Sequence, residues 1–531
     1  MSVGSVLNKP KNIWTVIIDI SKATDISIEG CSASLVTVSE GTCDVFIVGR
    51  FYRHRLVEVK NNQITIYASS GSIIPCYVRI RSNKLYLSNV AANILVENEA
   101  VSINTYVLFQ NMTGTPYPQS NIFNDITLCE ASGIYSVNNT SIVYKGSQLG
   151  VGDSATFDDI FGYMRSLFDS YLRDGDAVNL LLSGGYDSRL NLCLALDSAS
   201  RFGNTINTYH FYKDEDELSI TSAVAKQKNL PFACKKREDY IGEKSRAIIF
   251  DDDFIGFHNG NYRDDLPRWH GLLDEMSNED KNSLTVGLGA EAHKGKYYRH
   301  FTSVNDAEAV LGVNHRIVPE ICRALGIKSF NKNSQKSFFN ELVEHSNIYD
   351  RLDQKIDFMH YHTYVSNGWG GRTHDVSSYY SAPFPFVDQE FLNKVFSLPK
   401  EQKQDFYITK KMIETLNPNL SKIQYTSGNQ YSITNKKKSV KRYIPDIFYK
   451  ELSYFHHRYL GNTRKGRDSF FEEELNVIMT IVPCSYLTTL LKDILISKSP
   501  SVPHIRLNFA LQSFLYLTFL ERHKNIKLVM E

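Results

Sequence analysis

The chain has 531 residues, of which 42% are hydrophobic and 22% are charged, and its 59 Lys and Arg nearly balance 58 Asp and Glu, for a formal net charge of +1. These proportions are those of ordinary globular domains, which excludes wholesale disorder and fibrous repeats. A near-neutral chain also has no global electrostatic reason to bind nucleic acid or an anionic membrane. At roughly 100–200 residues per domain, the length predicts two to four domains.

No apolar stretch reaches the roughly 18 residues that a membrane helix needs. The longest candidate, residues 507–520, is interrupted by polar side chains, so we expect a packed core helix and no membrane span. The first residues lack the apolar centre of a signal peptide, which makes the cytoplasm the expected compartment. The eight cysteines form no C-x-x-C pair, and we expect them to be reduced and mostly buried.

Short β-rich runs dominate the first 150 residues. They cover residues 14–20, 43–49, 63–69, 76–82 and 84–89. Turn residues such as Gly71, Pro75 and the pair Asn61-Asn62 separate them. This pattern predicts a mostly antiparallel sheet domain.

From about residue 155 the pattern changes to helices that alternate with strands. Helical periodicity over residues 157–175 leads into an apolar run at 178–182, and after a further helix come a strand at 205–212 and a helix at 217–230. Such alternation predicts a parallel α/β sheet. After about residue 300 the chain is expected to be mainly helical.

The strongest chemical signal is the hexapeptide Ser-Gly-Gly-Tyr-Asp-Ser at residues 183–188, between a predicted strand and a predicted helix. Gly184 and Gly185 let the backbone pass close to phosphate oxygens. Ser183 and Ser188 offer hydroxyl donors, and the start of the helix presents free N–H groups to an anion. Asp187 needs a cation between itself and a phosphate, which Mg²⁺ can supply as a hard ion that prefers oxygen ligands. The alternative interpretation is an ordinary Gly-rich turn.

The hexapeptide resembles the pyrophosphate loop of the ATP pyrophosphatase superfamily, whose members cleave ATP between the α and β phosphates. The order of domains resembles the asparagine synthetase B type, which includes β-lactam synthetases and lasso-peptide macrolactam synthetases. Two further motifs carry the resemblance. Residues 286–291, V-G-L-G-A-E, stand where the family has a strand ending in G-x-G-x-D, and residues 385–388, P-F-V-D, are similar to its P-F-L-D.

The resemblance implies an α/β protein of two domains. Residues 1–150 would form a degenerate glutaminase-like (Ntn-type) β-rich domain. Residues 151–531 would form an adenine-nucleotide α-hydrolase-like synthetase domain, with a parallel sheet and a helical C-terminal extension. In the first half, the stretch from Gly71 to Asn93 and residues 126–146 are the parts that resemble the family.

Several positions depart from the family pattern. Ser2 stands where members that hydrolyse glutamine carry the nucleophilic Cys, so we expect no glutaminase activity. Glu291 replaces the second magnesium carboxylate of the family and remains a suitable ligand. Leu288 and Ser381 replace a polar catalytic residue and a Glu, respectively, so proton removal from an attacking amine must use other groups.

The late Lys-Gly loop of the family is also changed. Ser427-Gly428 occupies its expected place, and Lys422 is a nearby substitute for the lysine.

Other side chains are candidates for the missing functions, each with a structural alternative. Arg189 follows the hexapeptide and is a candidate ligand for phosphate or a substrate carboxylate, or else a helix-surface residue. The candidate bases, which are equally candidates for structural roles, are His293, His360, His362, Arg372 and His374. Trp369, Tyr379 and Tyr380 are candidates for an acceptor pocket or for core packing.

The resemblance therefore implies an AMP-forming carbon–nitrogen ligase that uses ATP and Mg²⁺ to adenylate a carboxylate of a small molecule or peptide. The amine would come from the substrate or from ammonia, and specialised peptide or surface-sugar biosynthesis is the expected setting, with a biosynthetic partner protein as a further expectation. Asp187 and Glu291 would hold the metal. The nucleotide would contact Ser183, Gly184, Gly185, Asp187, Ser188, Phe211 and Gly287.

Two alternatives to this ligase stay open. In the first, the chain is a catalytically degenerate ATP-binding subunit with a regulatory or assembly role. The second is another adenylating chemistry, such as sulfur insertion. This chemistry usually needs a nucleophilic cysteine, and Cys193 lies one helical turn beyond the hexapeptide.

Overall fold

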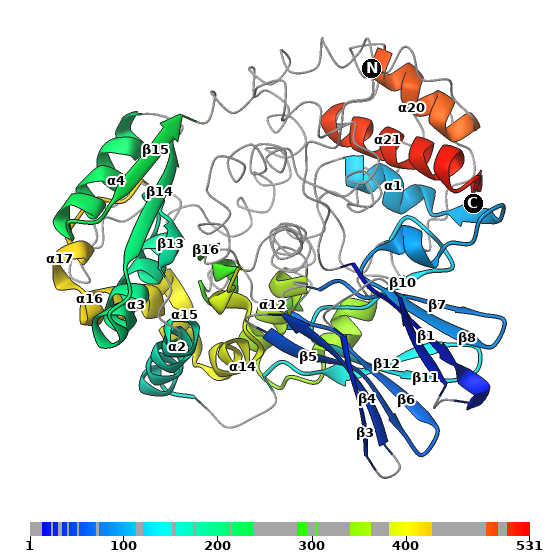
Figure 1. Ribbon diagram of the computed structural model, residues 1–531, viewed down its shortest axis with the longest axis horizontal. Coiled ribbons are helices and arrows are strands. Elements are labelled where there is room, and N and C mark those ends of the chain that lie inside the picture. The colour runs from blue at the N-terminus through cyan, green and yellow to red at the C-terminus, as the bar shows by residue number, and fades with distance from the viewer. Residues whose placement is uncertain are drawn as a thin grey trace.

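The computed structural model describes residues 13–22, 25–29, 34–39, 42–49, 52–70, 74–112, 121–150, 155–173, 177–212, 215–236, 284–285, 287, 289–294, 303–304, 340–362, 382–426, 485–496 and 507–530. These residues form a mixed α/β protein, with antiparallel sheets in the first half of the chain and helices toward the C-terminus (Figure 1). The predicted α/β class is confirmed at this level.

Two antiparallel sheets make up most of the first half. One has the strand order β10-β7-β8-β1-β2 and the other the order β12-β11-β6-β5-β4-β3. Their strands are β1 (Thr15–Asp19), β2 (Ile26–Glu29), β3 (Ser34–Ser39), β4 (Thr42–Gly49), β5 (Tyr52–Lys60), β6 (Gln63–Tyr67), β7 (Tyr77–Arg81), β8 (Lys84–Ser88), β10 (Thr127–Leu128), β11 (Gly133–Val137) and β12 (Ile142–Ser147).

The sequence explains the hairpins and the packing of these sheets. Asn61 and Asn62 both adopt positive φ, at 51° and 61°, which is the conformation that a two-residue turn between twisted strands requires. Alternation then places Ile64 and Ile66 of β6 on the buried face. They share one hydrophobic cluster with Val16 and Leu87 of the other sheet, so the two sheets pack face to face.

The region after residue 155 contains the predicted parallel sheet. Its strand order is β15-β14-β13-β16, and every neighbouring pair is parallel. The elements are α2 (Phe157–Leu172), β13 (Val178–Leu181), α3 (Tyr186–Phe202), β14 (Ile206–Tyr212), α4 (Glu215–Gln227), β15 (Phe232–Lys236) and β16 (Leu284–Thr285). A capping box between Thr156 and Asp159 starts α2, and Gly203, with φ of 75°, ends α3.

The remaining elements connect or cover the sheets. They are η1 (Ile20–Lys22), η3 (Ala91–Ile94), β9 (Ala100–Ile103), α1 (Thr105–Met112), η5 (Ala290–His293), α12 (Leu352–His360), η8 (Pro385–Val387), α14 (Gln389–Ser397), α15 (Lys400–Lys403), η9 (Gln404–Phe406), α16 (Tyr407–Leu416), α17 (Pro418–Ser421), α20 (Tyr486–Ile496), α21 (Leu507–His523) and β17 (Lys527–Met530).

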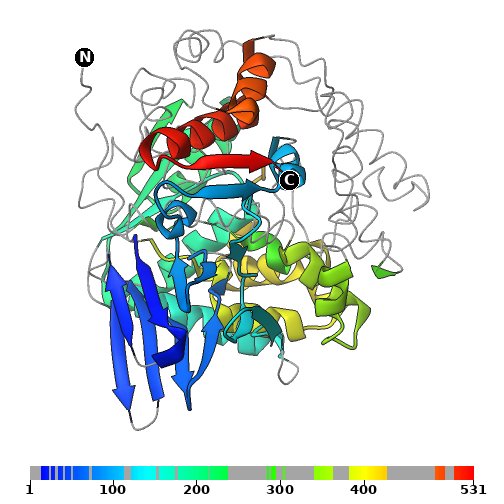
Figure 2. The same cartoon turned by 90° about the vertical axis from the view of Figure 1, so that its right-hand side faces the viewer.

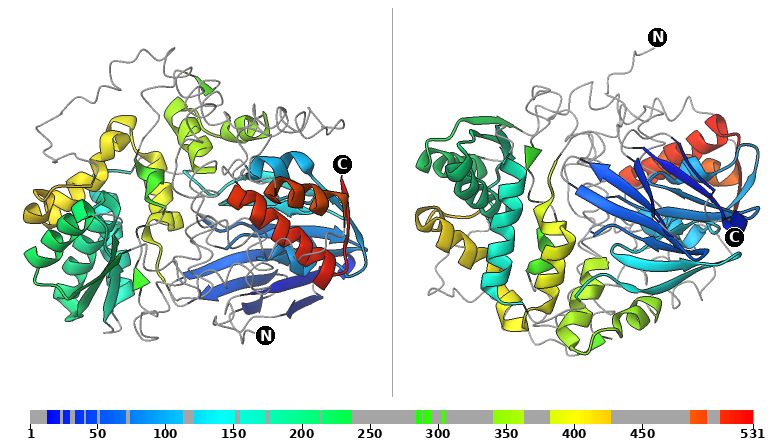
Figure 3. Two further views of the ribbon diagram at one scale, coloured as in Figure 1. Left: turned by 90° about the horizontal axis from the view of Figure 1, so that it is seen from above. Right: turned by 60° about the horizontal axis from the view of Figure 1, so that its bottom comes forward.

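Helix α14 links the two halves of the structure. Phe391 and Val395 join the hydrophobic cluster under the parallel sheet, whereas Leu392 and Phe396 join the cluster that includes Phe123 of the first half. Figure 3 shows the parallel sheet and the antiparallel sheets on opposite sides of this helix.

The end of the chain returns to the first half. Strand β17 pairs in parallel with β9, with Leu528 opposite Val101 (Figure 2). The side chains of α21 that are described and buried include Leu511, Phe514 and Leu517, which confirms the predicted core helix. No helix among the described residues is both long and apolar enough to cross a membrane. The division at residue 150 stays a prediction, since residues from both sides of it share one core.

Candidate functional site

The hexapeptide lies where the sequence predicts it, after β13, and its last three residues form the start of α3. The strand end is fixed to β14, because the Leu182 N–H donates to the carbonyl of Tyr209 at 2.9 Å. On the same residue, the Leu182 carbonyl accepts a hydrogen bond from Nδ1 of the buried His210 at 2.8 Å. The loop therefore starts from a backbone position that is held on both its N–H and its C=O side.

Hydrogen bonds within the loop hold its two serines together. The Ser188 hydroxyl donates to the Ser183 carbonyl at 2.9 Å and accepts from the Ser183 N–H at 3.0 Å. The two hydroxyl oxygens are 2.8 Å apart, and the Gly185 N–H donates to Ser183 Oγ at 3.3 Å. This closes the loop into a compact turn ahead of the helix.

Helix α3 begins with a bare N-terminus. Gly185 is its N-cap and no side chain caps the helix, so its first amide groups are directed at the loop. Asp187 lies in the first turn, where the helix dipole favours a negative charge. An uncapped helix start beside a glycine pair is an arrangement that binds phosphate groups in many proteins.

The motifs that are far apart in sequence meet at this loop. A Cβ built on Gly287 would lie 3.2 Å from Asp187 Cβ and 3.2 Å from the Ser188 nitrogen, so the G-x-G segment packs directly on the hexapeptide. A Cβ on Gly289, whose φ is 84°, would lie 2.2 Å from Val387 of P-F-V-D. These glycines are needed because backbone or side chains occupy the space a side chain would fill.

A fourth segment covers the loop from the other side. The Thr426 N–H donates to the Gly184 carbonyl at 3.1 Å, and a Cβ on Gly184 would lie 2.1 Å from Thr426 Cγ2. Thr426 directly precedes Ser427-Gly428, which lie outside the described residues.

Asp187 faces a lysine in this structure. The ammonium of Lys294 lies 2.8 Å from Asp187 Oδ2, and the lysine side chain is only 9% exposed. The ammonium also lies 5.5 Å from the centre of the Phe406 ring. Lys294 is not among the predicted site residues. The one signal for it in the sequence is its position three residues after Glu291, a predicted metal ligand.

Arg189 has a different role from the one predicted. It is fully buried, and its guanidinium donates to the carbonyls of Leu420, Ile423 and Gln424 at 3.1, 2.7 and 2.8 Å. It also stacks over the Tyr425 ring at 3.7 Å. This burial disfavours the prediction that Arg189 binds a phosphate or a substrate carboxylate, because its guanidinium already holds three carbonyls. The alternative of a helix-surface residue is wrong, because the side chain is fully buried.

An aromatic stack extends this arrangement to the loop. The Tyr186 ring stacks on Tyr425 with centres 3.9 Å apart and on Phe406 with centres 5.2 Å apart. Tyr425 therefore lies between Tyr186 and Arg189. The stack fixes the backbone of residues 423–426, which brings Thr426 against Gly184.

The candidate bases His293, His360 and His362 are buried. His293 lies under the site with Nε2 2.8 Å from Thr409 Oγ1, and burial lowers its pKa to about 3. Burial also lowers the pKa of His362 to about 3, with a smaller contribution from His345. His360 is 5% exposed. Buried imidazoles with lowered pKa values are weak bases, so His293 and His362 fit the structural alternative better than the catalytic one.

Cys193 fits a structural role as well. It is 1% exposed, and burial raises the pKa of its thiol to about 12. A thiol that stays protonated at neutral pH is a poor nucleophile, which disfavours sulfur chemistry at this residue.

The other predicted residues are only partly placed. Phe211 lies near the end of β14, half-buried, and Lys422 is exposed just after α17. The backbone of Glu291 lies in η5, but its side chain is outside the described part of the structure. The residues outside it altogether are Ser2, Leu288, Trp369, Arg372, His374, Tyr379, Tyr380, Ser381, Ser427 and Gly428.

Asp388 of P-F-V-D makes hydrogen bonds that stabilise the fold. Its Oδ1 accepts the Phe391 N–H at 3.0 Å and so caps α14, and it also accepts the Tyr163 hydroxyl at 2.6 Å. Within the described residues, no group of three or more His, Cys, Asp or Glu side chains is arranged to hold a metal ion. Of the two predicted metal ligands, Asp187 is therefore the one whose side chain the structure describes.

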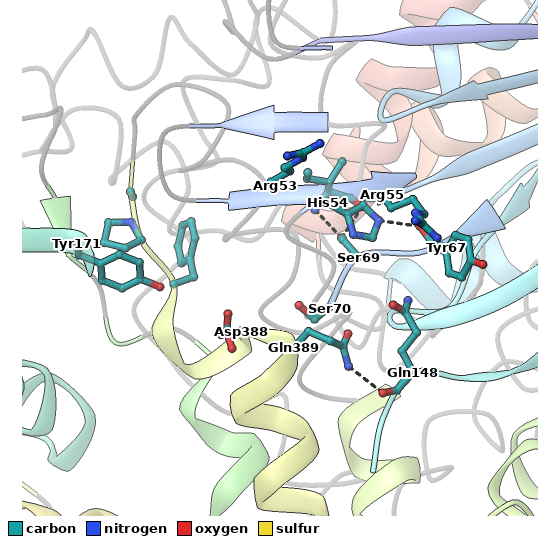
Figure 4. Close-up of a pocket in the computed structure, with 14 residues that line it drawn as sticks. Arg53, His54, Arg55, Tyr67, Ser69, Ser70, Gln148, Tyr171, Asp388 and Gln389 are labelled. Atoms are coloured by element: carbon teal, nitrogen blue, oxygen red, sulfur yellow. Dashed lines mark hydrogen bonds between the residues drawn. The ribbon is translucent and has the colours of Figure 1, made fainter. Parts of the chain in front are cut away.

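A separate cavity of about 520 Å³ lies between the first half of the chain and the P-F-V-D segment (Figure 4). Its polar walls are largely satisfied by the protein itself: His54 Nε2 donates to the Tyr67 carbonyl at 2.7 Å, and Arg55 pairs with Asp44 and Glu58. Gln389 donates to the carbonyl of Gln148 at 3.2 Å. Such internal pairing favours a role in joining the two halves.

Comparison of the chain with protein-family models gives no match, and neither does comparison with curated proteins.

Proposed function

We propose that this chain is an ATP-dependent ligase of asparagine synthetase type, which adenylates a carboxylate and forms an amide without glutaminase activity. The observation that carries the proposal is that four segments distant in sequence, one of which is the loop itself, pack on one another. Gly287 and Thr426 pack on residues 183–188, and P-F-V-D at 385–388 packs on Gly289. A Cβ built on Gly184, Gly287 or Gly289 would lie 2.1, 3.2 or 2.2 Å from an atom of the neighbouring segment. An ordinary Gly-rich turn does not require this convergence.

In the proposed reaction, a substrate carboxylate oxygen attacks the α-phosphorus of ATP. The bond between this phosphorus and the bridging oxygen breaks, and pyrophosphate leaves. An amine, either on the substrate or as ammonia, then attacks the acyl adenylate, loses a proton, and displaces AMP. The backbone of Gly184 and Gly185, the Ser183 and Ser188 hydroxyls and the uncapped start of α3 are the groups that would bind the pyrophosphate.

The donor set fits Mg²⁺, which prefers oxygen ligands. Asp187 provides a carboxylate beside the loop, and Glu291 is on the turn that Gly287 and Gly289 hold against it. When bound, the ion would neutralise charge that develops on the leaving pyrophosphate. The fold assignment goes with this proposal: a degenerate glutaminase-like domain in the first half and a synthetase domain in the second. We further propose a cytoplasmic enzyme of specialised peptide or surface-sugar biosynthesis.

The second candidate is a nucleotide-binding subunit that makes no amide. The burial of His293 and His362 favours it, because the described residues offer no histidine near the loop that is suited to accept a proton from an amine. The ligase and the subunit would both bind a nucleotide at this loop, and they differ only in whether they catalyse amide formation.

The test is ATP-dependent release of pyrophosphate, measured with Mg²⁺ and pooled small carboxylates, peptides or cell-extract metabolites. We expect release with one pool, and a loss of at least tenfold in Asp187→Asn. The matched control is Asp158→Asn, the same change in the first turn of α2 at an exposed position. Nucleotide binding without release from any pool would favour the subunit, and the absence of nucleotide binding would overturn both candidates.

A further inference from the structure

The environment of Lys294 is unusual for a lysine. Its side chain is 9% exposed, while that of its partner Asp187 is 25% exposed, so the ammonium lies on the inner side of the pair. Burying an ammonium costs several kcal/mol unless a counter-charge and good geometry compensate. Stability alone is a weak reason for such a pair, since apolar residues of similar volume usually serve as well.

The position of Lys294 is set by the turn that precedes it. Ala290, Ala292 and His293 are all buried, and the His293 ring is anchored on Thr409. Gly289 holds the start of this turn against Val387. The backbone of residue 294 is therefore fixed at the edge of the loop, and the long side chain reaches Asp187 from there.

Several positive groups lie around residues 186 and 187. Asp187 already interacts favourably with the N-terminal end of α3. Lys294 adds a full positive charge 2.8 Å from Asp187, and Lys410 lies 5.6 Å from the centre of the Tyr186 ring and 5.7 Å from that of Phe406. Two lysines and the start of α3 thus lie around residues 186 and 187, and positive groups gathered in this way suit a polyanion.

We propose that Lys294 is a phosphate-contacting residue of the nucleotide site, which Asp187 holds in place when no nucleotide is bound. This inference rests on the proposed function. When a nucleotide or pyrophosphate enters, the ammonium turns from Asp187 to phosphate oxygens, which leaves the carboxylate available to a cation. Lys294 then supplies, from the turn after Glu291, a positive charge for the leaving pyrophosphate.

The experiment measures the binding of inorganic pyrophosphate by calorimetry, with Mg²⁺ and separately in EDTA. Lys294→Met keeps the length of the side chain and removes its charge, and we expect at least tenfold weaker binding in both conditions. Lys294→Arg keeps the charge and should stay within about threefold of wild type. The matched control is Lys411→Met, a lysine of α16 whose ammonium lies 3.9 Å from the Phe157 ring centre, and it should bind as wild type does.

A double variant separates phosphate contact from a purely structural pair. Lys294→Met leaves the Asp187 carboxylate without its lysine, which can disturb the fold. Asp187→Asn combined with Lys294→Met removes both charges and is compared with Asp187→Asn alone, in EDTA. If Lys294 contacts phosphate, the double variant binds pyrophosphate at least tenfold more weakly than the single one.

The outcomes distinguish the inference from the function on which it rests. Suppose that the wild-type protein and Asp187→Asn both bind pyrophosphate, and that removing the Lys294 charge weakens this binding no more than twofold. This result overturns the inference and leaves the proposed function standing. Wild-type protein that binds no pyrophosphate in either condition overturns both.

Discussion

Thr426 and Gly184 are in direct contact across more than 240 residues of sequence. The Thr426 N–H donates to the Gly184 carbonyl at 3.1 Å, and the space that a Cβ of Gly184 would need is filled by Thr426 Cγ2 at 2.1 Å. Gly184 is therefore required both by the phosphate ligand that we propose and by the segment that covers the loop.

This contact predicts the effect of Gly184→Ala. The added methyl group must displace Thr426 or the loop, and such overpacking costs about 1–3 kcal/mol. We expect at least tenfold weaker binding of ATP or pyrophosphate, measured by calorimetry. Adding Thr426→Ser, which removes Cγ2, should restore a large part of the affinity.

The control for this change is Gly162→Ala in α2. That glycine is exposed and a Cβ there would meet nothing within 4 Å. Alanine is favoured over glycine within a helix by about 1 kcal/mol, so this variant should bind normally and unfold no earlier than wild type. Normal binding by Gly184→Ala would contradict the packing described here.

Arg189 is predicted to stabilise the segment over the loop without touching ligand. Arg189→Gln removes hydrogen bonds to three carbonyls and the stack on Tyr425. Because each hydrogen bond from a charged group contributes roughly 1.5–3 kcal/mol, we expect a loss of at least about 3 kcal/mol in the free energy of unfolding. Urea unfolding measures this loss.

Arg201 on the same helix provides the comparison. It pairs with Asp169 and Asp197 at the surface, so Arg201→Gln should cost less than about 1 kcal/mol. Weaker pyrophosphate binding in Arg189→Gln, with unchanged stability, would instead support the phosphate-ligand role that the structure disfavours.

The sequence predicts local elements of this protein better than its long-range contacts. Asn61-Asn62 indicated a turn between strands, and residues 178–182 indicated a strand before the hexapeptide, because turn chemistry and apolar periodicity are local properties. Lys294 and His210 were missed because nothing nearby in sequence shows that Lys294 meets Asp187 or that His210 meets Leu182. Arg189 was misread for the same reason, since its carbonyl partners lie more than 230 residues away.

The return of the chain to its first half was also not predictable from local pattern. Strand β17 has four residues and pairs with β9, which is more than 400 residues earlier. A short strand at the end of a chain carries too little periodicity to name its partner.

The pairing of β17 with β9 predicts that substitutions at two neighbouring residues cost very different amounts of stability. Leu528 is buried, whereas the next residue, Val529, is 39% exposed on the other face of the strand. Leu528→Asp places an unpaired carboxylate in the core and should cost about 3 kcal/mol or more in unfolding free energy. Val529→Asp should cost less than about 1 kcal/mol. Equal effects in urea unfolding would show that β17 does not pack as described.

His54 predicts a loss of stability in mild acid. Burial lowers the pKa of His54 to about 4, against an ordinary value of 6.5, and the neutral ring donates to the Tyr67 carbonyl at 2.7 Å. Between pH 6.5 and 4 the unfolded chain therefore binds a proton that the folded protein does not. Stability is fully present above pH 6.5 and falls progressively toward pH 4, by up to about 3 kcal/mol from this residue.

His54→Gln tests this origin, because the amide nitrogen of Gln can donate the same hydrogen bond but does not titrate. We expect urea unfolding of this variant to depend less steeply on pH between 6.5 and 4. The exposed His523 serves as the control, and His523→Gln should keep the wild-type slope. If His54→Gln also kept the wild-type slope, the loss of stability in acid would have to come from other groups, and His54 would not be held neutral by its position beside Tyr67.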